Sequence, residues 1–115
     1  STENNGGFAM TRMPVNIKLD ENNSKIILKV KGDGKQYQLR LKPDRRIRYW
    51  YIQSFQTNGE EQEIEIPLAK LYPSFRGYRL NLDNFSSKTI GEIAILIGNK
   101  MNEKFKLEVE KISIR

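Results

Sequence analysis

The stretch TIGEIAILIG, residues 89–98, sets the fold class of this chain. It is almost uninterrupted in apolar residues and rich in isoleucine, a β-branched residue that favours extended structure. Alternation along a strand separates its side chains into two faces, with Ile93, Ile95 and Ile97 on one and Ala94 and Leu96 on the other. Both faces are apolar, which is typical of a strand buried inside a sheet. We therefore expect a central strand here.

The chain then turns at NKMNEK, residues 99–104, and continues as FKLEVEKISIR, residues 105–115. The apolar positions of this last segment have a period of two, but their phase changes between Val109 and Ile112. An extra residue in one strand of an antiparallel pair produces such a change. The pattern predicts a strand with a β-bulge near Glu110 and Lys111.

Apolar and polar residues also alternate in the first part of the chain. Residues 15–19 have a strand pattern, and the polar sequence DENNS, residues 20–24, indicates a turn. The segment KIILKVKGDGKQYQLRLK, residues 25–42, contains two strand patterns on either side of Asp33 and Gly34. These two residues tolerate the positive φ of a tight turn, so they predict a hairpin.

The stretch RRIRYWYIQSF, residues 45–55, has two interpretations. Arginines beside aromatic rings could bind the phosphates and bases of a single-stranded nucleic acid. The same residue types also suit a half-buried strand whose long arginine side chains reach water. These residue types alone leave both interpretations open.

The segments that follow are shorter. A turn at TNGE, residues 57–60, precedes a brief strand that ends at Pro67. Residues 68–75 include a helical turn before Pro73. We expect irregular chain from Arg76 to about Lys88. About eight strands without a long helix predict an all-β protein, an antiparallel β-sandwich or barrel. We expect residues 1–115 to form a single domain.

The composition excludes several classes of function. The 115 residues carry a net charge of +6 and include no Cys and no His, so thiolate nucleophiles, disulfides and the commonest general base and metal ligand are missing. We expect a protein that is not an enzyme and has no metal and no cofactor. No apolar run approaches the roughly 20 residues of a membrane span. We expect a soluble protein, and its richness in Lys, Asn and Ile favours a bacterial, cytoplasmic source.

Several segments, in order, resemble the complex I intermediate-associated protein 30 family. They are NNGGFAMTR at 4–12, KVKGDGKQYQLRL at 29–41, SFQT at 54–57, IPLAKLYPSFRG at 66–77 and IGEIAILIGNKMNEKFKLEVEKI at 90–112. The resemblance implies a jelly-roll β-sandwich similar to galactose-binding and carbohydrate-binding domains, without a catalytic site. It also implies that residues 45–57 form a strand of that sandwich, so we expect no nucleic-acid partner. The named member of the family is an assembly factor for mitochondrial respiratory complex I, so the resemblance also implies a role in assembly.

The start of the chain departs from the family pattern. A further segment, with a strand or two, usually precedes the GGFA stretch, whereas only STENN precedes it here. We therefore expect a chain shortened at its N-terminus, with an open sheet edge. A second copy of the chain could cover that edge and form a homodimer, and the missing segment could cover it instead.

One candidate ligand site lies on the polar faces of two predicted strands. Gln38 and Arg40 lie on the face opposite Tyr37, and the next strand would add Arg48 and Trp50. An exposed aromatic ring can stack on a sugar while arginine and amide side chains bond its hydroxyls. The alternative, in which Trp50 packs under a loop, stays open.

A second candidate site, for a protein partner, is the loop that contains Phe75, Arg76, Tyr78 and Arg79, because two arginines there could bind carboxylates. Carboxylates such as Asp33, Asp83 and Glu92 could bind calcium, but only DENN, residues 20–23, has the closely spaced Asp and Asn of a calcium loop, and a turn explains it equally well. The sequence therefore predicts a non-catalytic protein-interaction or assembly module. The alternative is a carbohydrate-binding module that uses the concave face of a sheet.

Overall fold

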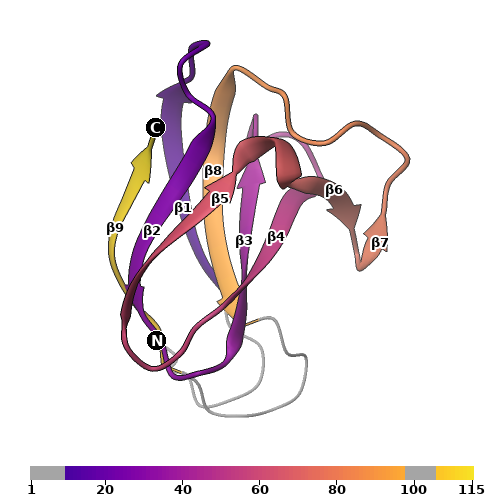
Figure 1. Ribbon diagram of the computed structural model, residues 1–115. Helices are drawn as coiled ribbons and strands as arrows, with labels where there is room; N and C mark the ends of the chain where they lie inside the picture. Colours follow the sequence, from indigo (N-terminus) through magenta and orange to yellow (C-terminus); the bar gives the residue numbers. More distant parts are fainter. Residues whose placement is uncertain (1–9, 98–105) are drawn as a thin grey trace.

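The computed structural model describes residues 10–97 and 106–115. They form two antiparallel sheets that face each other, here called sheet A and sheet B (Figure 1). Sheet A has six strands in the order β1 (Met10–Lys18), β8 (Thr89–Ile97), β3 (Gln36–Lys42), β4 (Trp50–Gln56), β6 (Tyr72–Phe75) and β7 (Tyr78–Arg79). Sheet B has three, in the order β5 (Glu61–Pro67), β2 (Lys25–Lys31) and β9 (Glu108–Ile114). The predicted all-β antiparallel sandwich is confirmed.

The hydrophobic core lies between the two sheets, and β8 is central to it. Cross-strand pairing places Ile93, Ile95 and Ile97 beside Leu41, Leu39 and Tyr37 of β3. On the other side of β8, Ala94 is fully buried and Leu96 is nearly so. The predicted burial of both faces of this strand is therefore confirmed. A short 3₁₀ helix, Leu68–Lys70, provides the predicted helical turn and adds Leu68 to the core.

The hairpin predicted at Asp33 and Gly34 is wrong. β2 pairs with β5 and β9, whereas β3 pairs with β4 and β8, so the chain crosses from sheet B to sheet A between them. Asp33 fixes the crossing, because its carboxylate accepts hydrogen bonds from the Tyr37 hydroxyl at 2.9 Å and from the Lys106 backbone N–H at 2.7 Å. A crossing and a hairpin both need residues that tolerate a tight turn, so local sequence does not separate them.

Thr57, at the end of β4, lies against the same crossing. Its hydroxyl donates to the Lys35 carbonyl at 2.7 Å and accepts from the Gly34 backbone N–H at 3.0 Å. A Cβ atom at Gly32 would stand only 2.4 Å from the Cβ of Thr57. The crossing therefore requires glycine at position 32 for space.

The strand predicted over residues 45–57 begins only at Trp50. Residues 43–49 form turns instead, where Asp44 accepts hydrogen bonds from the backbone N–H and the guanidinium of Arg46. An Asp that bonds to the backbone two residues on favours a turn over a strand. The irregular chain predicted from Arg76 to about Lys88 is also partly wrong, since it includes β7, which pairs with β6 in a hairpin.

The predicted β-bulge in the last strand is confirmed. Lys29 of β2 pairs with Lys111, but Val30 pairs with Val109, so Glu110 is the extra residue. The turn predicted over residues 99–104 and the start of the strand pattern at Phe105 lie outside the described residues.

Candidate binding face

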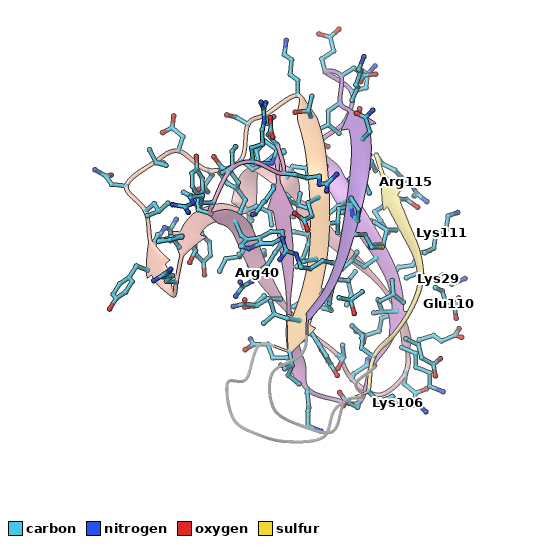
Figure 2. The ribbon with its side chains drawn as sticks, turned by 180° about the vertical axis from the view of Figure 1, so that it is seen from behind. Lys29, Arg40, Lys106, Glu110, Lys111 and Arg115 are labelled. Atoms are coloured by element: carbon cyan, nitrogen blue, oxygen red, sulfur yellow. The ribbon has the colours of Figure 1, made fainter. Side chains whose placement is uncertain are left out.

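The outer face of sheet A gathers cations around two aromatic rings. Alternation in β3 turns Gln38, Arg40 and Lys42 away from the core. Cross-strand pairing then places Arg40 beside Ile52 of β4 and Ala94 of β8. We call the following set the basic-aromatic face: Arg12, Arg40, Lys42, Trp50, Tyr72 and Arg79. Figure 2, seen from behind the view of Figure 1, shows Arg40 among the side chains of sheet A.

Trp50 is the centre of this face. The guanidinium carbon of Arg12 lies 5.3 Å from the centroid of its ring, and the ammonium of Lys42 lies 4.6 Å from it. Both distances are within the range of a cation–π interaction. Trp50 is half-buried, so it is neither a core residue nor a fully open platform.

Glu92 is the carboxylate of this cluster. It is nearly buried, and Arg12 donates two hydrogen bonds to it, from Nε at 2.8 Å and from Nη2 at 3.3 Å. The hydrogen bonds from Arg12 lower the pKa of the Glu92 carboxyl against the opposing effect of burial, and the charges of Arg12, Lys42 and Arg45 lower it further. Glu92 is therefore ionised at neutral pH and neutralised by Arg12.

Gln38 and Arg40 interact directly, as the prediction of a shared face required. The Nε and Nη2 atoms of Arg40 donate to Oε1 of Gln38 at 3.1 and 2.8 Å. Burial lowers the pKa of Arg40, yet a guanidinium keeps its charge far above neutral pH. The face thus holds a fixed, partly desolvated positive charge.

Strand alternation does not place Arg48 on this face. This residue lies in the turns that precede β4, where the alternation of a strand does not apply, and its side chain is exposed. The predicted ligand site is therefore brought together for Gln38, Arg40 and Trp50, and without Arg48.

The predicted partner loop adjoins the same surface. In the β6–β7 hairpin, Arg79 pairs with Ser74, which pairs with Trp50 of β4. The guanidinium of Arg79 lies 4.4 Å from the ring centroid of Tyr72. The two sites predicted separately from sequence are thus continuous across sheet A.

The other residues of the hairpin are exposed. Phe75 and Tyr78 pair with each other and have 37% and 76% of their surface exposed, which is unusual for large aromatic side chains. The turn between them consists of Arg76 and Gly77, whose φ angles are 52° and 85°. A left-handed conformation is unfavourable for arginine, so this tip carries local backbone strain.

The sites predicted from sequence did not include Arg12 and Lys42, and Glu92 was considered only as a possible calcium ligand. Lys42 follows Arg40 by two residues, so alternation alone could have placed it on the face. Arg12 and Glu92 come from β1 and β8, which are adjacent only in the folded sheet. No signal in the local sequence indicates that pair.

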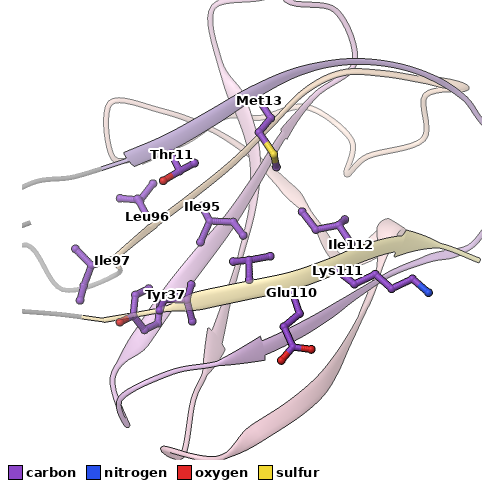
Figure 3. A pocket seen from close by; sticks show the side chains of 11 residues that line it. Thr11, Met13, Tyr37, Ile95, Leu96, Ile97, Glu110, Lys111 and Ile112 are labelled. Atoms are coloured by element: carbon purple, nitrogen blue, oxygen red, sulfur yellow. The ribbon is translucent and has the colours of Figure 1, made fainter. Parts of the chain in front are cut away.

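A groove lies on the other side of sheet A. It has a volume of about 510 Å³ and lies between β1 and β8 of sheet A and β9 of sheet B. Figure 3 shows Met13 from β1 and Ile112 from β9 pointing into it from opposite sheets. Its lining is mainly apolar, so it lacks the converging polar groups of the basic-aromatic face.

Residues 10–97 and 106–115 contain neither a cluster of metal-ligand side chains nor a helix suited to a membrane. In that part of the chain no three or more His, Cys, Asp or Glu side chains gather as metal ligands would. No helix there has the length and apolar character to cross a membrane.

Known proteins resemble this chain in sequence. The sequence profile of the complex I intermediate-associated protein 30 (CIA30) family matches residues 1–109. The chain belongs to this family. Two curated CIA30 relatives, from Caenorhabditis briggsae and Caenorhabditis elegans, are each named "Probable complex I intermediate-associated protein 30, mitochondrial" and are 30% identical over 105 residues. That match covers 81% of this chain but 29% of each relative, so the chain spans less than a third of their length.

Solved structures show which fold this CIA30 family chain adopts. A family 11 carbohydrate-binding module from Clostridium thermocellum, solved with a β-1,3-1,4-mixed-linked tetrasaccharide, matches 95% of this chain with a TM-score of 0.70 at 15% identity. A second structure of such a module, from the cellulase Lic26A-Cel5E, gives 0.72 at 14% identity. The match covers 70% and 69% of those chains. The jelly-roll fold predicted from the family resemblance is confirmed.

The source predicted from composition differs from that of the curated CIA30 relatives. Those relatives come from nematodes and are named as mitochondrial, whereas the sequence composition favours a bacterial chain. The bacterial, cytoplasmic source stays a prediction.

Proposed function

We propose that this domain is a non-catalytic protein-interaction module that binds an acidic surface of a partner through the basic-aromatic face and the β6–β7 hairpin. One observation carries the proposal: four cations, Arg12, Arg40, Lys42 and Arg79, lie on one sheet face with two aromatic rings. Arginine and aromatic residues are enriched where protein partners bind tightly. The module would serve assembly, as the names of the CIA30 relatives suggest.

The electrostatics of Glu92 support a role without catalysis. A general acid at neutral pH needs a raised carboxyl pKa, whereas the pKa of Glu92 is lowered. Among the described carboxylates it is the buried one, and Arg12 already holds it. Its role is to fix Arg12 beside Trp50.

Charge reversal tests this proposal. The tagged domain is incubated with a panel of purified complex I subunits, and capture is compared between the wild type and the double variant Arg40→Glu, Arg79→Glu. We expect the variant to lose the captured subunit, because like charges across an interface are repelled. The double variant Lys70→Glu, Lys88→Glu, at two exposed lysines outside that face, makes the same change in net charge and is the matched control. Equal capture by the double variant would rule out this face.

Carbohydrate binding is the second candidate, supported by the position of Gln38, Arg40 and Trp50 on one face. A sugar stacked on Trp50 would have to share the ring with Arg12 and Lys42, which disfavours this function. A glycan array with the wild type, Trp50→Ala and Trp50→Phe tests it. Absence of signal on every glycan would end this candidate.

A further inference from the structure

Lys42 is a nearly buried lysine on the outer face of sheet A. Only 7% of its surface is exposed, and its ammonium lies over the ring of Trp50. The described residues provide no hydrogen-bond acceptor or ion-pair partner for that ammonium. Lysine is rarely buried to this degree without a partner.

The surroundings of Lys42 compensate its charge only in part. Burial lowers the pKa of Lys42, and the positive charge of Arg12 acts in the same direction, while the carboxylate of Glu92 opposes them. Glu92, however, is hydrogen-bonded to Arg12. A ring can stabilise a cation, but it is not a substitute for a hydrogen-bonded anion.

We propose that Lys42 is the anchor for a single carboxylate, from an Asp or Glu side chain of the protein partner, seated beside Trp50. Arg12, Lys42 and Glu92 together carry one net positive charge, which one carboxylate balances. The choice of a polypeptide as the source of the carboxylate rests on the proposed function.

The site contains its own reporter. Trp50 is the only tryptophan of the chain, so its fluorescence responds to binding beside Lys42. The probes are a short capped oligoglutamate, a capped oligoglutamine of equal length and an oligogalacturonate. We expect a saturable change with oligoglutamate that weakens as salt is added, and no change with oligoglutamine.

Variants of Lys42 test whether oligoglutamate binding depends on the charge of this side chain. Lys42→Gln is expected to weaken oligoglutamate binding by about tenfold or more, while Lys42→Arg retains it and Lys70→Gln has no effect. Thermal unfolding establishes that each variant is folded. If Lys42→Gln does not fold, Lys42→Met keeps most of the apolar stem and tests the same charge.

The outcomes separate this inference from the proposed function. The carboxylate site is overturned if oligoglutamate gives no saturable signal, or if it binds folded Lys42→Gln as tightly as the wild type. Either result overturns the site even when Arg40→Glu, Arg79→Glu abolishes subunit capture. Saturation by oligoglutamate with unchanged subunit capture supports the site and removes the proposed partner surface. A response to oligogalacturonate alone overturns the polypeptide ligand and favours the carbohydrate function.

Discussion

Arg12 and Glu92 form an ion pair of 2.8 Å although they are 80 residues apart in the sequence. The pair joins strand β1, at the margin of sheet A, to the central strand β8. It also holds the guanidinium of Arg12 beside Trp50. One interaction thus links the stability of the sheet margin to the arrangement of the candidate site.

This pair predicts how stability depends on pH. The folded-state pKa of Glu92 is below its ordinary value of 4.5, so the stabilisation is complete above that pH and is lost as pH falls through the folded-state pKa. Glu92→Gln should lower the free energy of unfolding by about 1–3 kcal/mol at pH 7 and flatten its acid dependence. Urea unfolding between pH 2 and 7 measures both, and a wild-type-like acid dependence in the variant would contradict the prediction.

A second prediction concerns the crossing between the sheets. In Gly32→Ala the added Cβ would meet the nearly buried Thr57, so we expect a loss of about 1–3 kcal/mol in the free energy of unfolding. Chemical denaturation measures it, with Lys31→Ala at the exposed neighbouring position as the control. A loss no larger than that of the control would show that the crossing can shift.

The strained hairpin tip gives a third prediction. Asparagine tolerates a positive φ better than arginine and is preferred before glycine in tight hairpin turns. Arg76→Asn should therefore raise the free energy of unfolding by about 0.5–1 kcal/mol. If Arg76 contacts the partner, subunit capture should fall in the same variant, while Arg76→Lys keeps the charge and the strain. Unchanged or lower stability would contradict the assigned strain.

The bulge in β9 gives a fourth prediction. Deleting Glu110 would make β9 regular against β2, because Val109 and Lys111 would then be consecutive partners of Val30 and Lys29. A flat edge pairs with other strands more readily than a bulged one. We expect the deletion variant to associate more strongly with rising concentration than Glu110→Ala, which keeps the bulge. Sedimentation velocity measures this association. Equal association in both would contradict it, and the homodimer predicted from sequence stays a prediction.

Local alternation was sufficient to predict much of the fold. It located the buried strand around Ile95 and the extra residue at Glu110, because both change the pattern of apolar residues within a few positions. It did not reveal which sheet a strand joins, since the turn at Asp33 has the composition of a hairpin. That choice depends on contacts with distant segments, such as the bond from Lys106 to Asp33.

The candidate site was predictable only where it follows one strand. Gln38 and Arg40 share a face because they are two residues apart. Arg48 was misplaced because hydrogen bonds between Asp44 and Arg46 hold the preceding chain in a turn. Arg12 and Glu92 meet through strand order, a property of the whole sheet that no short stretch of sequence records.

The extra residue at Glu110 has a consequence for the protein in concentrated solution. In a fibril, identical strands stack in register, and each added strand must form backbone hydrogen bonds with the previous strand along its full length. Where β9 bends, that pairing fails after a few residues. The extra residue Glu110 thus makes the β9 edge a poor template for a regular stack of strands.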